Sequence, residues 1–231
     1  MAETGNALAA VQPARVHYFE DLQTQKEAAS LGMWLFLVTE VMFFGGLFLA
    51  YAVYRALYPA AFAHGSHLLS WELGAFNTFV LILSSLTMAL GVHAAATGRR
   101  KATSAYLLLT ILLGSAFLGV KVVEYKDKFD HHLVPGPSFG AVAAAGADAA
   151  HGFPPELSHA GQIYFSLYFA MTGLHAVHML AGIPLLAWLA LAAWRGHYTA
   201  EYHVPVENVG LYWHFVDIVW IFLFPLLYLI H

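Results

Sequence analysis

Five long apolar stretches constrain this chain more than any other feature of its sequence. They cover residues 31–53, 73–96, 104–125, 162–194 and 209–230. A helix that rises about 1.5 Å per residue needs about 20 apolar residues to cross the hydrocarbon core of a bilayer, and each stretch is long enough. The stretches are continuous and do not alternate between apolar and polar residues, which favours helices over a transmembrane barrel. We therefore predict an all-α integral membrane protein, a five-helix transmembrane bundle.

The composition agrees with a bilayer as the solvent. Apolar residues fill 60% of the 231 positions and charged residues only 10%, too few to coat a water-soluble domain. The formal net charge is −4 and the longest basic run is Arg99, Arg100 and Lys101, which excludes nucleic acid as a partner because that binding needs many phosphate contacts. The absence of cysteine excludes disulfides, thiolate metal sites and iron-sulfur clusters, so histidine and carboxylates are the available metal ligands.

The positions of lysine and arginine predict the orientation of the bundle. With the N-terminus inside, the inner side holds Arg15, Lys26, Arg99, Arg100, Lys101 and Arg195, and the outer side holds Arg55, Lys126 and Lys128. Cations concentrate on the cytoplasmic side of membrane proteins. The excess on the inner side therefore predicts that the N-terminus lies inside and the C-terminus outside.

Outside the five stretches the chain is polar or irregular. Residues 1–30 contain acids and lack a basic region followed by an apolar core, so we predict a polar cytoplasmic segment without a cleavable signal peptide. Residues 127–161 contain Pro135-Gly136-Pro137 and Pro154-Pro155 and are predicted to form an irregular outer loop. Residues 31–231 as a whole form one predicted membrane domain.

Five ionisable side chains are predicted to form a polar layer in the inner half of the membrane. Helical rise places them at a similar depth: Glu40, His175, His178, His214 and Asp217. Such residues are costly in hydrocarbon and usually face the interior of a bundle or serve a function. A metal site is one hypothesis, but carboxylate metal sites in bundles typically use Glu-x-x-His pairs, and no span contains one. We expect packing, lipid contact or local proton exchange, and no relay across the membrane, because the middles of the second, third and fifth spans are largely apolar.

A second polar layer is predicted near the outer boundary, with Glu72, Asn77, Lys121 and Glu124 as its members. Lys121 and Glu124 are three residues apart and therefore share one face of a helix, where they can pair. One interpretation is that the pair neutralises itself and extends toward the lipid headgroups. The alternative is that the pair binds a lipid headgroup directly.

Three sequence blocks carry a resemblance to a known family. They are GMWLFLVTEVMFF at 32–44, FSLYFAMTGLHAVH at 165–178 and YWHFVDIVW at 212–220. Together with Asn77-Thr78 and Glu124-Tyr125, these blocks resemble subunit III of the haem-copper terminal oxidases, in the family order and across all five spans. The polar N-terminal segment leaves only five helices, as in the short bacterial members of the family.

The resemblance implies a non-catalytic subunit of an oxygen-reducing complex in the bacterial inner membrane. This chain would bind no haem or copper, because those cofactors belong to the partner subunits, and it would bind phospholipid. Its expected partners are subunit I as the main contact, subunit II and small subunits, with cytochrome c as the electron donor to the complex. The complex would reduce oxygen to water and translocate protons, while this chain stabilises subunit I, holds lipid and supports proton uptake and oxygen access.

The resemblance also assigns expectations to single residues and leaves alternatives. Arg195 matches a family position near lipid phosphate and has the charge for that contact, with ordinary anchoring by a positive charge as the alternative. Glu40 would lie near the face that packs toward subunit I and lipid. The alternatives for the whole chain are subunit III of a quinol oxidase, a nitric-oxide-reductase-associated relative, and a free-standing membrane metalloenzyme.

Overall fold

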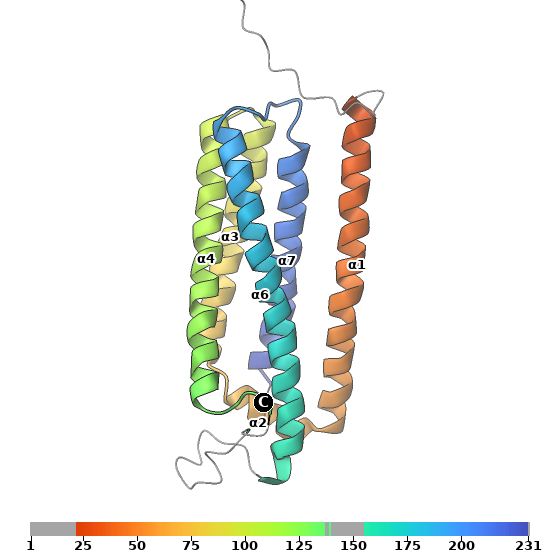
Figure 1. Ribbon diagram of the computed structural model, residues 1–231, viewed down its shortest axis with the longest axis vertical. Helices are drawn as coiled ribbons and strands as arrows, with labels where there is room; N and C mark the ends of the chain where they lie inside the picture. Colours follow the sequence, from red (N-terminus) through yellow and green to blue (C-terminus); the bar gives the residue numbers. More distant parts are fainter. Residues whose placement is uncertain (1–21, 137–138, 140–154, 231) are drawn as a thin grey trace, which may run out of the picture.

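The fold consists of long antiparallel helices (Figure 1). A computed structural model describes residues 22–136, 139 and 155–230. Its elements are α1 (Leu22–Leu57), α2 (Pro59–His67), α3 (Trp71–Ala96), α4 (Arg100–Asp130), the 3₁₀ turn η1 (Pro155–Leu157), α6 (Ser158–Trp194) and α7 (Val204–Tyr228). Five of these helices are long and apolar enough to cross a membrane. The predicted all-α bundle with five membrane helices is therefore confirmed.

The helices run further than the apolar stretches that predicted them. α1 begins at Leu22 and not at residue 31, and α4 continues to Asp130 and not to 125. Apolar composition marks the depth of the hydrocarbon, whereas backbone hydrogen bonding continues into the polar region beyond it. Both ends of the predicted outer loop are consequently helical. The predicted N-terminal segment lies largely outside the described residues, as does the centre of that loop.

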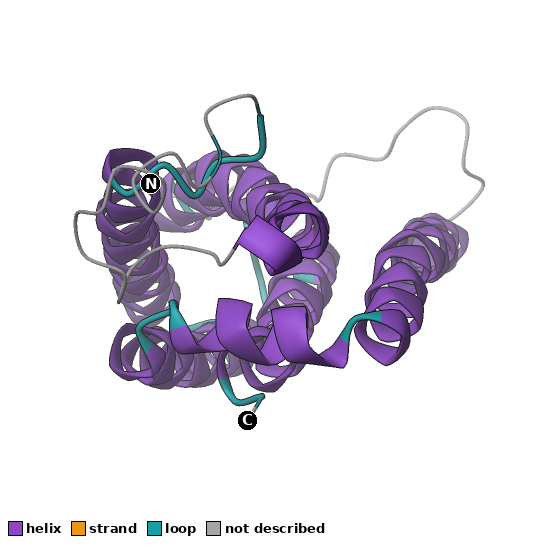
Figure 2. Cartoon of the chain, turned by 90° about the horizontal axis from the view of Figure 1, so that it is seen from below, coloured by secondary structure: helices purple, strands orange, loops and turns teal. Residues whose placement is uncertain are grey.

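The short helix α2 was not predicted. Pro59 stands in its first turn, where the missing N–H costs nothing, and nine residues are too few to register as a span. The buried side of α2 contains Phe62 and Gly65, and a Cβ on Gly65 would lie only 2.4 Å from the ring of Tyr164 on α6. α2 thus lies across one end of the bundle, as Figure 2 shows.

Four helices form a group and the fifth stands beside it. α3, α4, α6 and α7 pack around a shared interior, with α3 against α4 and α4 against α6 as extensive contacts. α1 packs mainly on α7, α6 and α2, and Figure 2 shows it to one side of the other four. We call the end of the bundle where α1 begins the N-terminal face, and the end where α7 finishes the C-terminal face.

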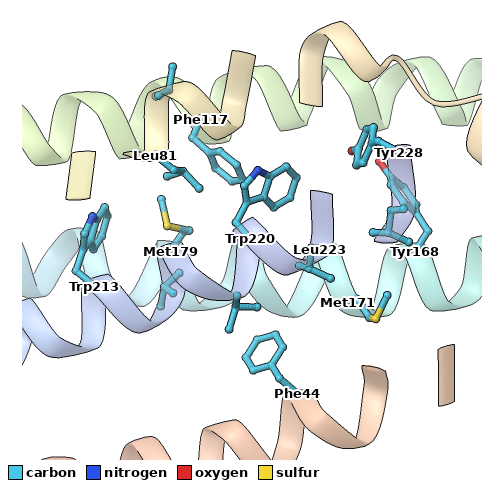
Figure 3. Packing of buried hydrophobic residues seen from close by; sticks show 14 of the residues in the cluster. Phe44, Leu81, Phe117, Tyr168, Met171, Met179, Trp213, Trp220, Leu223 and Tyr228 are labelled. Carbon is cyan, nitrogen blue, oxygen red and sulfur yellow. The ribbon is translucent and has the colours of Figure 1, made fainter. Parts of the chain in front are cut away.

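The interior of the four-helix group is built around two tryptophans. Trp220 lies edge-on to Phe117 of α4, with 4.7 Å between the ring centres, and Figure 3 shows both in the packed cluster. Trp213 fits between two glycines, because a Cβ on Gly114 of α4 or Gly182 of α6 would lie 2.8 Å or 2.9 Å from its indole ring. Helices in lipid associate through such close packing, since lipid is as apolar as their side chains.

Candidate functional site

Glu40 on α1 and His178 on α6 form a polar pair at the junction of the two helices. Oε2 of Glu40 lies 3.0 Å from Nε2 of His178. The side chains are 17% and 13% exposed, so protein encloses most of both. The structure therefore brings these two members of the predicted inner layer into contact, although 138 residues separate them in the sequence.

The second ring nitrogen of His178 fixes how many protons this pair holds. Nδ1 lies 2.9 Å from the backbone oxygen of Leu174, which can only accept, so Nδ1 carries a hydrogen. If the imidazole is neutral, Nε2 accepts a hydrogen bond from a protonated Glu40; if the imidazole is charged, Nε2 donates to the carboxylate. In both cases one proton lies between the two side chains, and the pair can exchange it.

Aromatic side chains surround the pair on the bundle side. The ring of Phe44 lies 5.3 Å from the His178 ring, and the hydroxyl of Tyr212 donates to the backbone oxygen of His178 at 2.8 Å. Figure 3 shows Phe44 pointing from α1 toward the bundle. On the opposite side, α1 exposes its apolar residues Val41, Met42 and Phe43. The pair thus lies at the edge of the fold, next to the outward surface of α1.

His214 and Asp217 belong to a different junction, between α7 and α3. Nδ1 of His214 lies 2.7 Å from the hydroxyl of Ser85 on α3. Asp217 is buried and lies beside the same serine. Their equal depth with Glu40 therefore does not produce contact, because α7 presents these two side chains to α3 while α1 packs on another side of α7.

His175 lies inside the four-helix group. Its ring is 5.2 Å from the rings of Phe117 and Trp220, and neither ring nitrogen has a hydrogen-bond partner among the described residues. The predicted inner layer is therefore divided among three places in the fold. In residues 22–136, 139 and 155–230, no three histidine, aspartate or glutamate side chains are grouped so that they could hold a metal ion.

Lys121 and Glu124 form a buried network with two tyrosines. Nζ of Lys121 lies 3.0 Å from Oε2 of Glu124 and donates to the hydroxyl of Tyr228 at 3.0 Å. The hydroxyls of Tyr168 and Tyr228 both donate to Oε1 of Glu124. α4, α6 and α7 each contribute to this network, and Figure 3 shows its two tyrosines, Tyr168 and Tyr228, close to each other.

The network is enclosed and does not reach the headgroups. Lys121 and Glu124 are each 2% exposed, so the interpretation that they extend toward the membrane surface is wrong. The ammonium group lies 5.1–5.7 Å from the centres of four rings, those of Tyr125, Tyr168, Trp220 and Tyr228. Hydroxyl donors and aromatic faces replace the water that both charges lose, which is the condition under which a buried ion pair is tolerated.

The other two members of the predicted outer layer lie apart from this network. Glu72 is exposed in the first turn of α3. Asn77 is fully buried, and its side-chain amide has no hydrogen-bond partner in the described residues. The sequence did not identify Tyr168, Tyr228 and Ser85 as polar partners. For the two tyrosines the reason is that a tyrosine near the end of a span has the same pattern as an interfacial aromatic residue.

Arg195 ends α6 on the N-terminal face and is exposed. The next residue, Gly196, has a φ of +81°, and a Cβ there would lie 2.4 Å from the guanidinium group of Arg100. Glycine at this position therefore allows Arg100 to approach the end of α6. Arg100 therefore lies beside the end of α6, where Trp194 and Arg195 are exposed.

Comparisons with known proteins find one family. The sequence matches the family described as cytochrome c oxidase subunit III over residues 18–153 and 153–231. Cytochrome bo(3) ubiquinol oxidase subunit 3 of Pseudomonas aeruginosa is 31% identical over 198 residues, which are 86% of this chain and 83% of that protein. Cytochrome c oxidase subunit 3 of Arabidopsis thaliana is 31% identical over 204 residues, which are 85% of this chain and 66% of the plant protein. Cytochrome c oxidase subunit 3 of Cyprinus carpio is also 31% identical over 204 residues, 67% of its length.

Proposed function

Because the chain belongs to the cytochrome c oxidase subunit III family, we propose that it serves as the non-catalytic subunit III of an aerobic respiratory cytochrome c oxidase. In this role it packs against the catalytic subunit I in a bacterial inner membrane and contacts subunit II and small subunits. It binds no haem or copper itself. The match to the family over nearly the whole chain carries this proposal.

The arrangement of the polar side chains supports an accessory role. Lys121 and Glu124 satisfy each other inside the bundle, and His175 lies between aromatic rings. In our proposal the chemistry of oxygen reduction belongs to the partner subunits, which supply the haem and copper, as the family match implies.

We infer that the Glu40–His178 pair contributes to proton uptake. The pair lies beside the outward surface of α1, where a partner subunit or lipid covers it in the complex. A site that holds one exchangeable proton next to that boundary can pass it to a neighbouring acceptor. We assign Glu40 to this role, and we assign phospholipid binding and oxygen access to the apolar surface around it.

A quinol oxidase is the second candidate, and one comparison favours it. The alignment covers 83% of the ubiquinol oxidase subunit of Pseudomonas aeruginosa, against 66% and 67% of the two cytochrome c oxidase subunits. The alignment therefore spans a larger share of the quinol oxidase subunit than of the other two. The site that receives electrons lies outside this chain in either complex.

Purification of the native complex tests the proposal. A tag on this chain should co-purify the other oxidase subunits, and the complex should oxidise cytochrome c while it consumes oxygen. Oxidation of quinol and not of cytochrome c would assign the chain to the second candidate. Co-purification with a nitric oxide reductase, or stoichiometric iron or copper in the chain purified alone, would contradict both.

A further inference from the structure

A groove runs along α1 toward the C-terminal face. Its volume is about 370 Å³. One wall is a stripe of α1, the opposite wall is the end of α7, and α2 forms the floor; the lining residues are Phe48, Tyr51, Ala52, Arg55, Ala56, Pro59, Ala63, Leu226 and Ile230. Small alanine side chains on α1 and α2 leave this space open where α1 stands apart from α7.

The walls of the groove are fixed by contacts between the helices. The hydroxyl of Tyr51 donates to the backbone oxygen of Leu226 on α7, and the ring of Tyr51 lies edge-on to Phe62 of α2 at 5.3 Å. Further toward the membrane centre, the ring of Phe48 lies 6.5 Å from that of Phe222 on α7. The groove is therefore formed before any ligand binds, which lowers the entropy cost of binding.

The groove is apolar at one end and charged at the other. Phe48 and Ala52 line the end toward the membrane centre, and Arg55 lines the end near the close of α1. The partly exposed tyrosines Tyr54 and Tyr58 lie beside Arg55, and aromatic residues of this kind mark the depth of the lipid headgroups. Arg55 therefore lies at the depth of the phosphate groups, while the rest of the groove extends into the hydrocarbon.

Arg55 offers a charge that the described protein does not neutralise. It is exposed, and no ion pair in the described part of the chain includes it. A guanidinium group matches phosphate because it donates two parallel hydrogen bonds. An apolar groove with one such cation at the headgroup depth fits a molecule that has a phosphate at one end and an acyl chain at the other.

We propose that this groove binds a phospholipid of the leaflet on the C-terminal face, with its phosphate at Arg55 and one acyl chain between α1 and α7. The proposal rests on the lipid-holding part of the proposed function and gives it a place. The site is distinct from the predicted headgroup contact of Arg195, which lies on the opposite face. The lipid fills the space beside α1 that protein side chains leave open.

Quantitative lipid analysis of the purified complex tests the site. Arg55→Gln removes the charge, and Ala56→Phe fills the groove from an exposed position without disturbing the interior. Each variant should lose one bound phospholipid relative to the unaltered complex after the same detergent wash. Arg55→Lys should retain the lipid, because the charge remains. Lys101→Gln, at an exposed position on the opposite face, is the control and should leave the phospholipid count unchanged.

The outcomes separate this site from the proposed function. If Arg55→Gln and Ala56→Phe both retain the full complement of phospholipid, the groove is not a lipid site, and the co-purifying subunits still decide the role of the chain. If a helix of another subunit occupies the groove, Ala56→Phe will weaken that subunit's retention while the phospholipid count stays constant, and the proposal fails. If the chain purifies without other oxidase subunits, the proposed function fails, and the lipid count can still be read.

Discussion

At the scale of single residues, the Lys121–Glu124 pair shows how the fold accommodates charge inside a membrane. Both side chains lose water completely, yet two tyrosine hydroxyls and the opposite charge occupy their hydrogen-bonding positions. Removing one member of a buried ion pair leaves the other charge without compensation. Removing either residue alone should therefore cost more stability than the intact pair contributes.

Substitution of Lys121 tests this dependence. Lys121→Met should lower the free energy of unfolding by about 3–5 kcal/mol, because Glu124 is left as an uncompensated buried charge. The double variant Lys121→Met with Glu124→Gln should recover most of the loss, since the amide oxygen still accepts from both tyrosines. Denaturation of the purified chain in detergent, followed by tryptophan fluorescence, measures the effect. Lys126→Met, at an exposed position of the same helix, is the control; an equal loss there would contradict the argument.

Glu40 gives a second prediction at this scale. Glu40→Ala should leave the haem absorption spectrum of the complex unchanged while it reduces sustained turnover, because the residue ligates no haem and holds the exchangeable proton. It should also weaken the docking of α1 by about 0.6–1.7 kcal/mol, the range measured for hydrogen bonds between membrane helices. Glu40→Gln should restore docking through an amide N–H to Nε2 of His178. Loss of the haem spectrum in an assembled complex would overturn the accessory role.

Depth along a helix could be predicted for individual residues, and their contacts could not. Helical rise placed Glu40, His178 and Asp217 in one layer, but the side of the helix on which each neighbour packs decides which of them meet. The partners of the Lys121 side chain could not be predicted for the same reason. Its tyrosine partners come from the other end of the chain, where they have the pattern of an ordinary interfacial belt.

At the scale of helices, Trp213 couples α7 to α4 and α6. The indole lies against two glycines, and its Nε1 donates to the hydroxyl of Ser84 on α3 at 2.8 Å. One side chain therefore sets the distances among all four helices of the group. Gly114 and Gly182 leave the space that the indole ring of Trp213 occupies.

A matched pair of glycines on α4 tests this packing. Gly114→Ala should destabilise the fold by about 1–3 kcal/mol, because the new methyl group overlaps a rigid indole ring. Gly119→Ala on the same helix meets nothing within 4 Å and should be neutral. The thermal stability of the two purified variants, compared in one detergent, measures the difference. Equal midpoints would show that the indole can move aside.

The existence and type of the long helices could be predicted, whereas α2 could not. Continuous apolar stretches above about 20 residues have few alternatives in a bilayer. The segment after Tyr58 is too short for that argument, and its helix depends on Phe62 and Gly65 packing against Tyr164. A nine-residue helix that depends on such tertiary contacts has no hydrophobic periodicity long enough to predict it from the sequence.

At the scale of the whole molecule, the orientation in the membrane remains a prediction that the chain makes easy to test. It contains no cysteine, so a single introduced cysteine is the only reactive thiol. Lys101→Cys lies on the N-terminal face and Lys126→Cys near the C-terminal face. A membrane-impermeant maleimide should label Lys126→Cys in intact cells and Lys101→Cys only after permeabilisation. The reverse pattern would show that the N-terminus lies outside.

The position of α1 beside the other helices has a consequence for the order in which the protein is made. α1 leaves the ribosome before the other described helices, yet three of its attachments lie in the later part of the sequence: Glu40 binds His178, Lys26 donates to the backbone oxygen of Glu201 and Tyr51 donates to that of Leu226. These partners are 138 to 175 residues away in the sequence. α1 therefore cannot form these contacts until α6 has been made, and it completes its docking only with α7. Synthesis that stops before His178 leaves the carboxyl group of Glu40 without this partner inside the bilayer, where an ionisable side chain is costly.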